Sequence, residues 1–257
     1  MTSSTNMIMI TRPAHQAVAL TEMIQSHHAA VFLFPTIEII PRRASSFSKK
    51  ESKVLLKSFD IAVFISANAI EHGLNLFPQL KNTPLLATIG DSSAQALNKK
   101  IGRQPDITPS EQFNSEGLLA CPALQDVSNK HIIIVRGNGG REVLKEELER
   151  RGAEVCYIEA YQRAKAQPDI PQFEHYLQNN SIEAIVITSA ESLRNLVELT
   201  PQASVQNVLK IPLIIMNQRL VAIAKELGFT QEQVIAKSAS DQGIVETLKE
   251  HKFLSSS

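Results

Sequence analysis

Arginine side chains stand at turns that directly follow short apolar runs of this sequence, where they could bind an anion. These arginines are Arg12, Arg136, Arg141 and Arg219. An arginine only donates hydrogen bonds, whereas the free N–H groups at the start of a helix require acceptors, so helix capping does not explain these residues. A carboxylate or phosphate held at the same turns would explain them. Solvated surface arginines are the alternative.

Hydroxyl side chains occupy the same kind of turn and admit two interpretations. They are Ser66, Ser93, Thr188 and Ser189. Ser and Thr are frequent N-cap residues, and a cap contributes about 1 kcal/mol to helix stability, so capping alone accounts for many of them. Binding of a ligand by the hydroxyl groups and neighbouring backbone N–H groups is the functional alternative.

A glycine-rich turn, Arg136-Gly-Asn-Gly-Gly-Arg141, is the one segment that suggests a nucleotide. It follows an apolar run and precedes a helical pattern, and Glu159 lies about 20 residues further on, as in a dinucleotide site. Glu142 replaces the third glycine of that fingerprint, and no phosphate-binding loop with Lys-Ser or Lys-Thr occurs. A nucleotide-dependent enzyme that uses the turn from Gly137 to Gly140 is therefore kept as an alternative.

Neither the histidines nor the cysteines form a recognisable reactive or metal-binding pattern. The seven histidines have no metal-ligand spacing, and Cys121 and Cys156 lie outside any Cys-x-x-Cys motif. We expect both cysteines to be reduced and packed. No serine or cysteine nucleophile with a partnered base is visible, and we expect neither a metal nor a cofactor.

Eight short apolar runs alternate with amphipathic stretches, and this alternation predicts an α/β fold with parallel sheets. The runs are residues 7–10, 31–34, 61–65, 85–89, 132–135, 155–158, 182–187 and 213–216. In such sheets ligands bind beyond the carboxyl ends of the strands. The arginine and hydroxyl turns follow these runs, so we expect them at that edge.

The sequence also repeats weakly at a nearly constant spacing, which indicates an internal duplication. Residues 60–70 can be laid on 183–193 at an offset of 123, and residues 8–12 on 132–136 at an offset of 124. A later pair, 89–102 and 215–228, has an offset of 126. We therefore expect two similar domains, each a parallel sheet flanked by helices.

Two ways of dividing the chain are compatible with this repeat. A cut near Ser128 gives tandem halves, whereas crossings at the proline-ended segments 35–41 and 157–168 give one continuous and one discontinuous domain. The residues alone leave this choice open.

Composition excludes several classes of protein. The 257 residues contain 26 Lys and Arg and 26 Asp and Glu, so there is no overall charge to attract nucleic acid or an anionic membrane. No apolar run approaches the roughly 20 residues of a membrane span. The first residues do not resemble a signal peptide, so we expect a cytoplasmic protein.

Motifs along almost the whole chain resemble the uroporphyrinogen-III synthase family. In chain order they are Ile-Thr-Arg-Pro, Pro-Thr-Ile-Glu-Ile-Ile-Pro, Phe-Ile-Ser-Ala-Asn-Ala-Ile, Thr-Ile-Gly-Asp-Ser-Ser-Ala, Phe-Asn-Ser-Glu-Gly-Leu-Leu, Val-Arg-Gly-Asn-Gly-Gly-Arg-Glu, Glu-Ala-Tyr-Gln-Arg and Ile-Thr-Ser-Ala-Glu-Ser-Leu. Each motif alone is weak, but their common order is specific.

The resemblance implies two α/β domains joined by a two-stranded antiparallel linker. It favours a first domain of residues 1–34 and 167–257, a second of residues 42–156, and linker strands at 35–41 and 157–166. It also implies the reaction: hydroxymethylbilane, a linear tetrapyrrole, closes to uroporphyrinogen III with loss of water and inversion of ring D, without a cofactor.

The resemblance further assigns roles to single residues. Tyr161 matches the tyrosine that the family is thought to use as a hydrogen-bond donor to the departing hydroxyl. The four hydroxyl residues named above match turns that face the substrate, and we expect Arg12, Arg136, Gly137, Arg141 and Arg219 to bind its carboxylates. At Arg219 some relatives carry a threonine-containing turn instead. The family suggests a monomer. A non-catalytic two-domain anion-binding protein, or an interaction module that kept the fold and lost activity, is the alternative.

Overall fold

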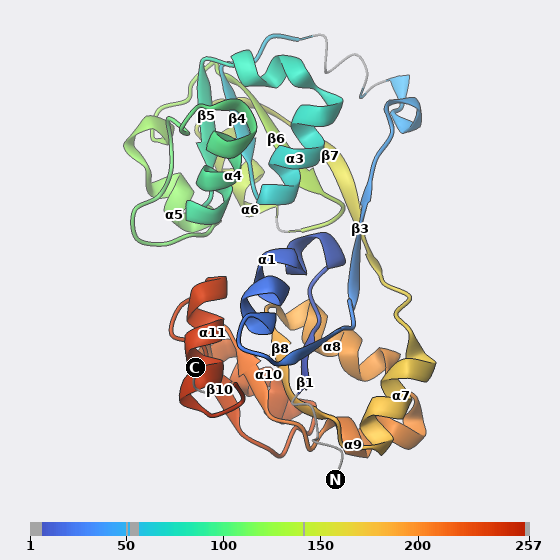
Figure 1. Ribbon diagram of the computed structural model, residues 1–257. Helices are drawn as coiled ribbons and strands as arrows, with labels where there is room; N and C mark the ends of the chain where they lie inside the picture. The colour runs from blue at the N-terminus through green and yellow to red at the C-terminus, as the bar shows by residue number, and fades with distance from the viewer. Residues whose placement is uncertain (1–6, 50, 52–56, 141, 255–257) are drawn as a thin grey trace. The chain divides into compact units, whose positions relative to one another are not determined.

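The computed structural model describes residues 7–49, 51, 57–140 and 142–254, and its contacts divide the chain into two compact units (Figure 1). Unit 1 comprises Met1–Glu38 and Ala164–Ser257, and unit 2 is Ile39–Arg163. The chain passes from one unit to the other within two strands, β3 (Ile37–Pro41) and β7 (Glu154–Lys165).

Unit 1 is a five-stranded sheet in the order β10-β9-β8-β1-β2, and every neighbouring pair is parallel. The strands are β1 (Met7–Ile10), β2 (Ala30–Leu33), β8 (Ile182–Ile187), β9 (Leu213–Ile215) and β10 (Gln233–Ile235). The helices are α1 (Ala14–Gln25), α7 (Ile170–Gln178), α8 (Ala190–Leu199), α9 (Val205–Val208), α10 (Gln218–Glu226) and α11 (Asp241–Glu250).

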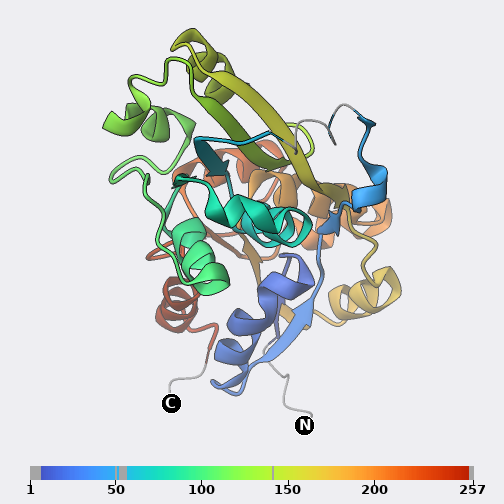
Figure 2. The ribbon, with the colours of Figure 1, turned by 90° about the horizontal axis from the view of Figure 1, so that it is seen from above.

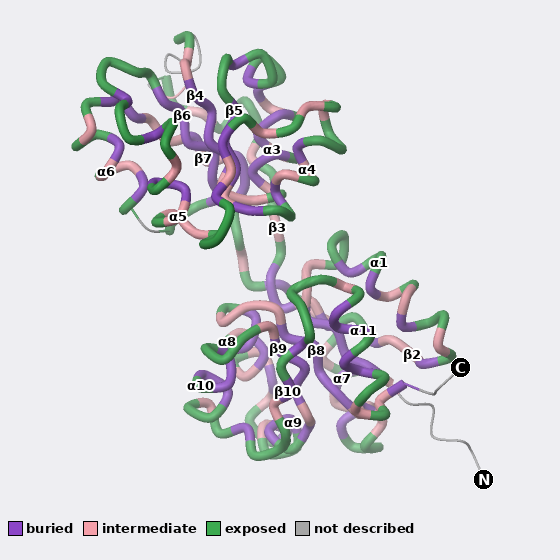
Figure 3. Tube along the Cα trace, turned by 90° about the vertical axis from the view of Figure 1, so that its left-hand side faces the viewer, coloured by how far each residue is buried: buried purple, intermediate pink, exposed green. Residues whose placement is uncertain are grey.

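Side chains of alternate strand positions build the two layers of the unit 1 core. Ile8 and Ile10 of β1 pack with α1 and α11 on one face, and Met9 packs with α7, α8 and α10 on the other. A strand buried on both faces must be apolar throughout, which explains the near-continuous Ile and Val runs of the sequence. Figure 3 shows these strands as buried segments within more exposed helices.

Unit 2 has the sheet order β3-β7-β6-β4-β5. Its other strands are β4 (Ile61–Phe64), β5 (Leu85–Thr88) and β6 (His131–Gly137). Helices α3 (Ala67–Leu76) and α4 (Asp91–Ile101) cover one face, and α5 (Ser115–Ala120) and α6 (Val143–Arg150) cover the other (Figure 2). Short 3-10 helices occupy Ala44–Ser46, Pro78–Asn82, Pro122–Leu124 and Gln202–Ser204.

Strands β3 and β7 are neighbours that run in opposite directions. In unit 2 the backbone N–H of Arg42 donates to the carbonyl of Ala160 at 3.0 Å. In unit 1 the N–H of Ala166 donates to the carbonyl of Thr36 at 3.3 Å. The residue number thus rises across β3 from 36 to 42 while that of its partner falls from 166 to 160, as in an antiparallel ladder.

The prediction of two similar parallel sheets flanked by helices is confirmed. The order β2-β1-β8-β9 of unit 1 corresponds to β7-β6-β4-β5 of unit 2, as the offsets of the sequence repeat require. Strand β10 has only a bridge between Ala87 and Ile107 as its counterpart. All eight expected strands are present. β10 was not predicted because it contains only two apolar residues, too few for a pattern. Among the described residues, no helix has the length and apolar character needed to cross a membrane.

Candidate functional site

The turns singled out by the sequence lie at the carboxyl-end edge of each parallel sheet. In unit 1, Arg12 follows β1, Thr188 and Ser189 follow β8, and Arg219 follows β9. In unit 2, Ser66 follows β4, Ser93 lies in the first turn of the helix after β5, and Arg136 and Gly137 end β6. Arg141 lies outside the described residues. Each unit therefore carries some of the predicted site residues on one edge of its sheet.

The serine hydroxyls serve partly as helix caps. Ser66 is the N-cap of α3 and accepts a hydrogen bond from the N–H of Ala69 at 3.1 Å. Ser189 caps α8 in the same way through the N–H of Ser192 at 3.0 Å. Ser93 is not a cap, because Gly90 occupies that position, and its side chain is buried. Capping uses an acceptor site of the hydroxyl and leaves its proton available.

The arginines of unit 1 differ in their surroundings. Arg12 pairs with the carboxylate of Asp241, the first residue of α11, and its side chain is 14% exposed. A ligand carboxylate at Arg12 would therefore compete with an internal one. Arg219, the second residue of α10, is exposed.

Arg136 is a buried cation with several internal partners. Its residue is 5% exposed, and its Nη1 donates to Oε1 of Glu142 at 3.0 Å. The guanidinium lies 4.3 Å from the ring centre of Tyr157, a cation–π contact. Burial is the main cause that raises the pKa of the Tyr157 phenol. Glu142, which replaces the third glycine of a dinucleotide fingerprint, thus supplies the carboxylate that neutralises Arg136.

Tyr161 lies on β7 with no exposed surface. The register of β6 and β7 shifts after Arg136, so that Gly137 stands opposite Tyr161 instead of Ala160. The phenol oxygen is 3.1 Å from Oγ of Ser66. Gly137 makes room for the ring, because a Cβ there would lie 2.6 Å from Cε2 of Tyr161. The β-bulge and the glycine together place this side chain.

Asn138 holds the backbone around Tyr161, a role that sequence reasoning missed. Its backbone N–H donates to the carbonyl of Tyr161 at 3.1 Å, and its Oδ1 accepts from the N–H of Arg163 at 2.6 Å. Its position between two glycines of a turn was the only available signal. The side chain extends the pairing of β6 and β7 beyond the end of β6.

A buried hydroxyl network in unit 1 was also missed. Oγ of Ser192 is 2.8 Å from Oγ1 of both Thr11 and Thr36, and the Thr11 hydroxyl donates to the carbonyl of Val186 at 2.9 Å. Asn195 donates to the carbonyl of Thr36 at 3.0 Å. Three hydroxyl groups in a chain can each donate and accept, so burial leaves none unsatisfied. The network fixes the carboxyl end of β1 and the N-terminal part of α8 relative to the start of β3.

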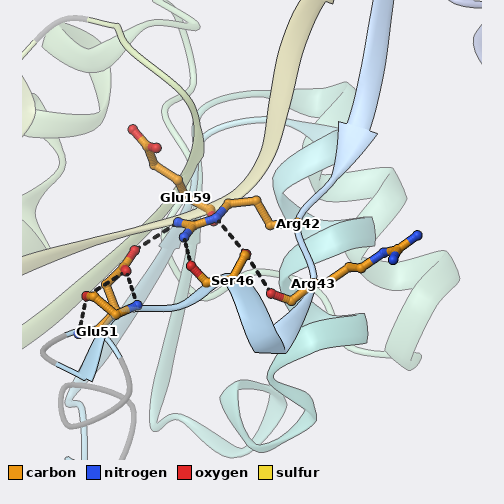
Figure 4. A network of polar contacts seen from close by, with 6 residues as sticks. Arg42, Arg43, Ser46, Glu51 and Glu159 are labelled. Carbon is orange, nitrogen blue, oxygen red and sulfur yellow. Dashed lines mark hydrogen bonds and ion pairs between the residues drawn. The ribbon is translucent and has the colours of Figure 1, made fainter.

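Arg42 organises a second polar network in unit 2, at the end of β3 (Figure 4). Its guanidinium donates to Glu51 at 2.8 Å, to the carbonyl of Ser46 at 3.1 Å and to the carbonyl of Glu159 at 3.3 Å. It also stacks 4.3 Å from the ring centre of Phe47. Hydrogen bonding to Arg42 is the main cause that lowers the pKa of Glu51 to about 2. The network ties the segment after β3 to the strand that carries Tyr161.

Both cysteines are free thiols, as expected. Burial raises the pKa of Cys156 to about 11 and also raises that of Cys121. Within the part of the chain that the structure describes, no three His, Cys, Asp or Glu side chains cluster as a metal site would require.

Comparison with known proteins gives a consistent result. A family model described as "Uroporphyrinogen-III synthase HemD" matches residues 18–246. The uroporphyrinogen-III synthase of Salmonella typhimurium is 32% identical over 94% of this chain and 99% of its own length, and that of Escherichia coli is 30% identical over the same shares.

Solved structures share the fold. A mutant uroporphyrinogen III synthase of Thermus thermophilus matches with a TM-score of 0.61 and 15% identity over 96% of this chain and 97% of its own. The enzyme of Helicobacter pylori matches with a TM-score of 0.60 and 14% identity over 95% and 98%.

Proposed function

The chain belongs to the uroporphyrinogen-III synthase family, and from that premise we propose how its residues perform the reaction. The reaction is the cyclisation of hydroxymethylbilane to uroporphyrinogen III, with loss of water and inversion of ring D, in tetrapyrrole biosynthesis. The enzyme is a lyase. The proposal rests on the placement of Tyr161. Its phenol has no exposed surface, stands opposite Gly137 and lies beside the hydroxyl of Ser66.

Substrate binding is assigned to the two sheet edges. The substrate is a polyanion, and helix N-termini with a few arginines can hold its carboxylates on a protein of zero net charge. In unit 1 the binding residues are Arg12, Thr188, Ser189 and Arg219, and in unit 2 they are Ser66, Ser93, Arg136 and Gly137. Arg12 exchanges its partner Asp241 for a substrate carboxylate. Arg136 remains paired with Glu142 and contributes to binding from its buried position at the end of β6.

Catalysis requires conformational control more than a strong nucleophile. Without enzyme the linear substrate closes to the type I isomer, so the protein must hold ring D where it attacks through its substituted carbon. The C–O bond of the hydroxymethyl group breaks as the pyrrole nitrogen supplies electrons, which gives an azafulvene. Ring D attacks it to form a spiro intermediate, which reopens and recloses. A proton supplied by Tyr161 helps the hydroxyl to leave as water, and the proton released from carbon at closure restores the donor.

The reaction needs no nucleotide in this proposal. The carboxylate of Glu142 lies 3.0 Å from Arg136, within the glycine-rich turn where a dinucleotide would place its phosphates. We further propose that the protein works as a cytoplasmic monomer without nucleic acid or membrane partners, which its balanced charge supports.

The test supplies freshly generated hydroxymethylbilane to the purified protein and separates the oxidised uroporphyrin isomers by chromatography. We expect type III in excess over a heat-inactivated sample. Tyr161→Phe should lower turnover by 100-fold or more, the usual size of a general-acid contribution, about 10² to 10⁴. Tyr176→Phe is the matched control, because this tyrosine packs against the unit 1 core. Only type I product from folded protein would contradict the function; normal turnover by Tyr161→Phe would remove Tyr161 from the mechanism.

A further inference from the structure

The hydroxyl of Tyr161 cannot meet the substrate directly in the observed arrangement of unit 2. Tyr161 has no exposed surface and belongs to the core between α3 and the sheet. Its phenol oxygen is directed at Ser66, whose side chain is only partly buried. A proton from Tyr161 therefore has Ser66 Oγ as its first acceptor.

The hydrogen bonds around Ser66 make its hydroxyl a suitable carrier of that proton. Oγ accepts from the N–H of Ala69 at 3.1 Å and lies 3.1 Å from the Tyr161 oxygen. If Tyr161 donates, both lone pairs of Oγ are engaged and the serine's own proton points away from both donors. Two accepted bonds polarise the hydroxyl, and the positive end of α3 favours negative charge on Oγ.

We propose that Ser66 is the catalytic residue that touches the departing hydroxyl, and that Tyr161 acts through it. This inference rests on the proposed function. As the C–O bond breaks, Ser66 gives its proton to the leaving oxygen, which departs as water, and takes the proton of Tyr161. The proton that carbon loses at ring closure returns along the same two oxygens. Each hydroxyl ends with the proton count with which it began.

Substitutions at Ser66 can separate this role from capping. In Ser66→Asp the carboxylate still accepts from Ala69 and Tyr161, and Asp is as good a cap as Ser, but it has no proton to give near neutral pH. Ser66→Thr keeps both the cap and the hydroxyl, and the extended backbone of Ser66, φ −166° and ψ 166°, accepts a β-branched side chain. Asn114→Asp is the matched control, because Asn114 caps α5 of the same unit through the N–H of Gly117 at 2.8 Å.

The assay measures kcat for type III formation and the thermal unfolding midpoint of each variant. We expect Ser66→Asp to lose 100-fold or more in kcat, as Tyr161→Phe does, while Ser66→Thr stays within about fivefold and Asn114→Asp is unchanged. The double variant Ser66→Asp, Tyr161→Phe should be no slower than either single variant, because residues that act as one unit are not additive.

Several outcomes would overturn the relay while leaving the function intact. They are a folded Ser66→Asp with a normal kcat, or losses that multiply in the double variant. If Ser66→Asp does not fold, single-turnover rates of the wild-type enzyme in mixtures of H₂O and D₂O decide: a curved dependence indicates two moving protons, and a straight line contradicts the relay. Failure of the wild type to form type III would instead refute the function itself.

Discussion

Gly137→Ala should disable the enzyme through one contact, the approach of a new methyl group to Tyr161. The added Cβ would lie 2.6 Å from Cε2, 2.7 Å from Cζ and 3.1 Å from the hydroxyl oxygen of Tyr161. Ordinary contact begins at 3.4 Å, so the ring must move by about 0.8 Å. Gly137 is not among the glycines with positive φ, so backbone strain adds nothing to this effect.

A displacement of this size is enough to separate the two hydroxyl groups. The oxygens of Ser66 and Tyr161 are 3.1 Å apart, and a hydrogen bond is effectively lost beyond about 3.5 Å. Misplacement of a reacting group by about 1 Å can lower a rate by about 10²-fold. We therefore expect kcat for type III formation to fall about 100-fold. Overpacking should lower the free energy of unfolding by about 1–3 kcal/mol.

Gly73→Ala separates the loss of stability from the loss of position. A Cβ on Gly73 of α3 would lie 2.6 Å from Cγ1 of Val135, an equally close contact in the same unit that leaves Tyr161 untouched. Chromatography of the product isomers gives kcat, and thermal unfolding followed by circular dichroism gives stability. We expect Gly73→Ala to lower the unfolding midpoint and to keep kcat within about threefold. A folded Gly137→Ala with wild-type kcat would refute the argument that the placement of Tyr161 controls the rate.

Three further measurements test other parts of the structure. Because the pKa of Glu51 is lowered from 4.5 to about 2 mainly by its hydrogen bond to Arg42, the pair stabilises the fold above pH 4.5 and this stability disappears as the pH falls toward 2. Urea unfolding should therefore show Glu51→Gln less stable than wild type at pH 7, by under about 1 kcal/mol for a partly exposed pair, and equal to it near pH 2. Burial raises the pKa of Cys156 to about 11, so at pH 8 iodoacetamide should modify it more slowly than an unfolded cysteine, as read by mass spectrometry of the native and denatured protein. Activity should survive dialysis against a chelator without added nucleotide; loss that zinc or magnesium restores would contradict the cofactor-free mechanism.

The sequence predicted the strands well because burial on both faces of a parallel sheet demands apolar runs. Strand β8 has the same bounds as the predicted run 182–187, and β4 is one residue shorter than the predicted run 61–65. Strand β7 (Glu154–Lys165) covers the predicted run 155–158 and most of the predicted linker strand 157–166, and backbone pairing with β3 sustains it where apolar character stops.

The candidate site was predictable in position but not in detail. Parallel topology alone places the turn residues at one edge of each sheet, as the order of apolar runs and turns in the sequence predicted. The ion pair of Arg12 with Asp241 joins residues 229 positions apart, and the contact of Ser66 with Tyr161 spans 95 positions. Neither pair has a spacing rule. The roles of Ser66 and Tyr161 toward the substrate are predictions that the experiments above test.

The two units share the order of four strands, but they differ at the positions of Tyr161 and Gly137. The two copies share the same frame: Ser66 and Ser189 are equivalent at the offset of 123, and each caps the helix that follows its strand. At the offset of 124, however, the counterparts of Tyr161 and Gly137 are Ile37 and Pro13.

The polar groups at this edge of unit 1 include the buried hydroxyls of Thr11, Thr36 and Ser192, which satisfy one another. The capping serine is thus common to both copies, whereas the phenol behind it, and the glycine that admits the phenol, exist in unit 2 alone. The proposed proton transfer through Ser66 therefore depends on two positions, 137 and 161, at which the two copies differ. A reaction with one leaving group needs one proton donor, and the difference between the two otherwise similar units supplies it in unit 2.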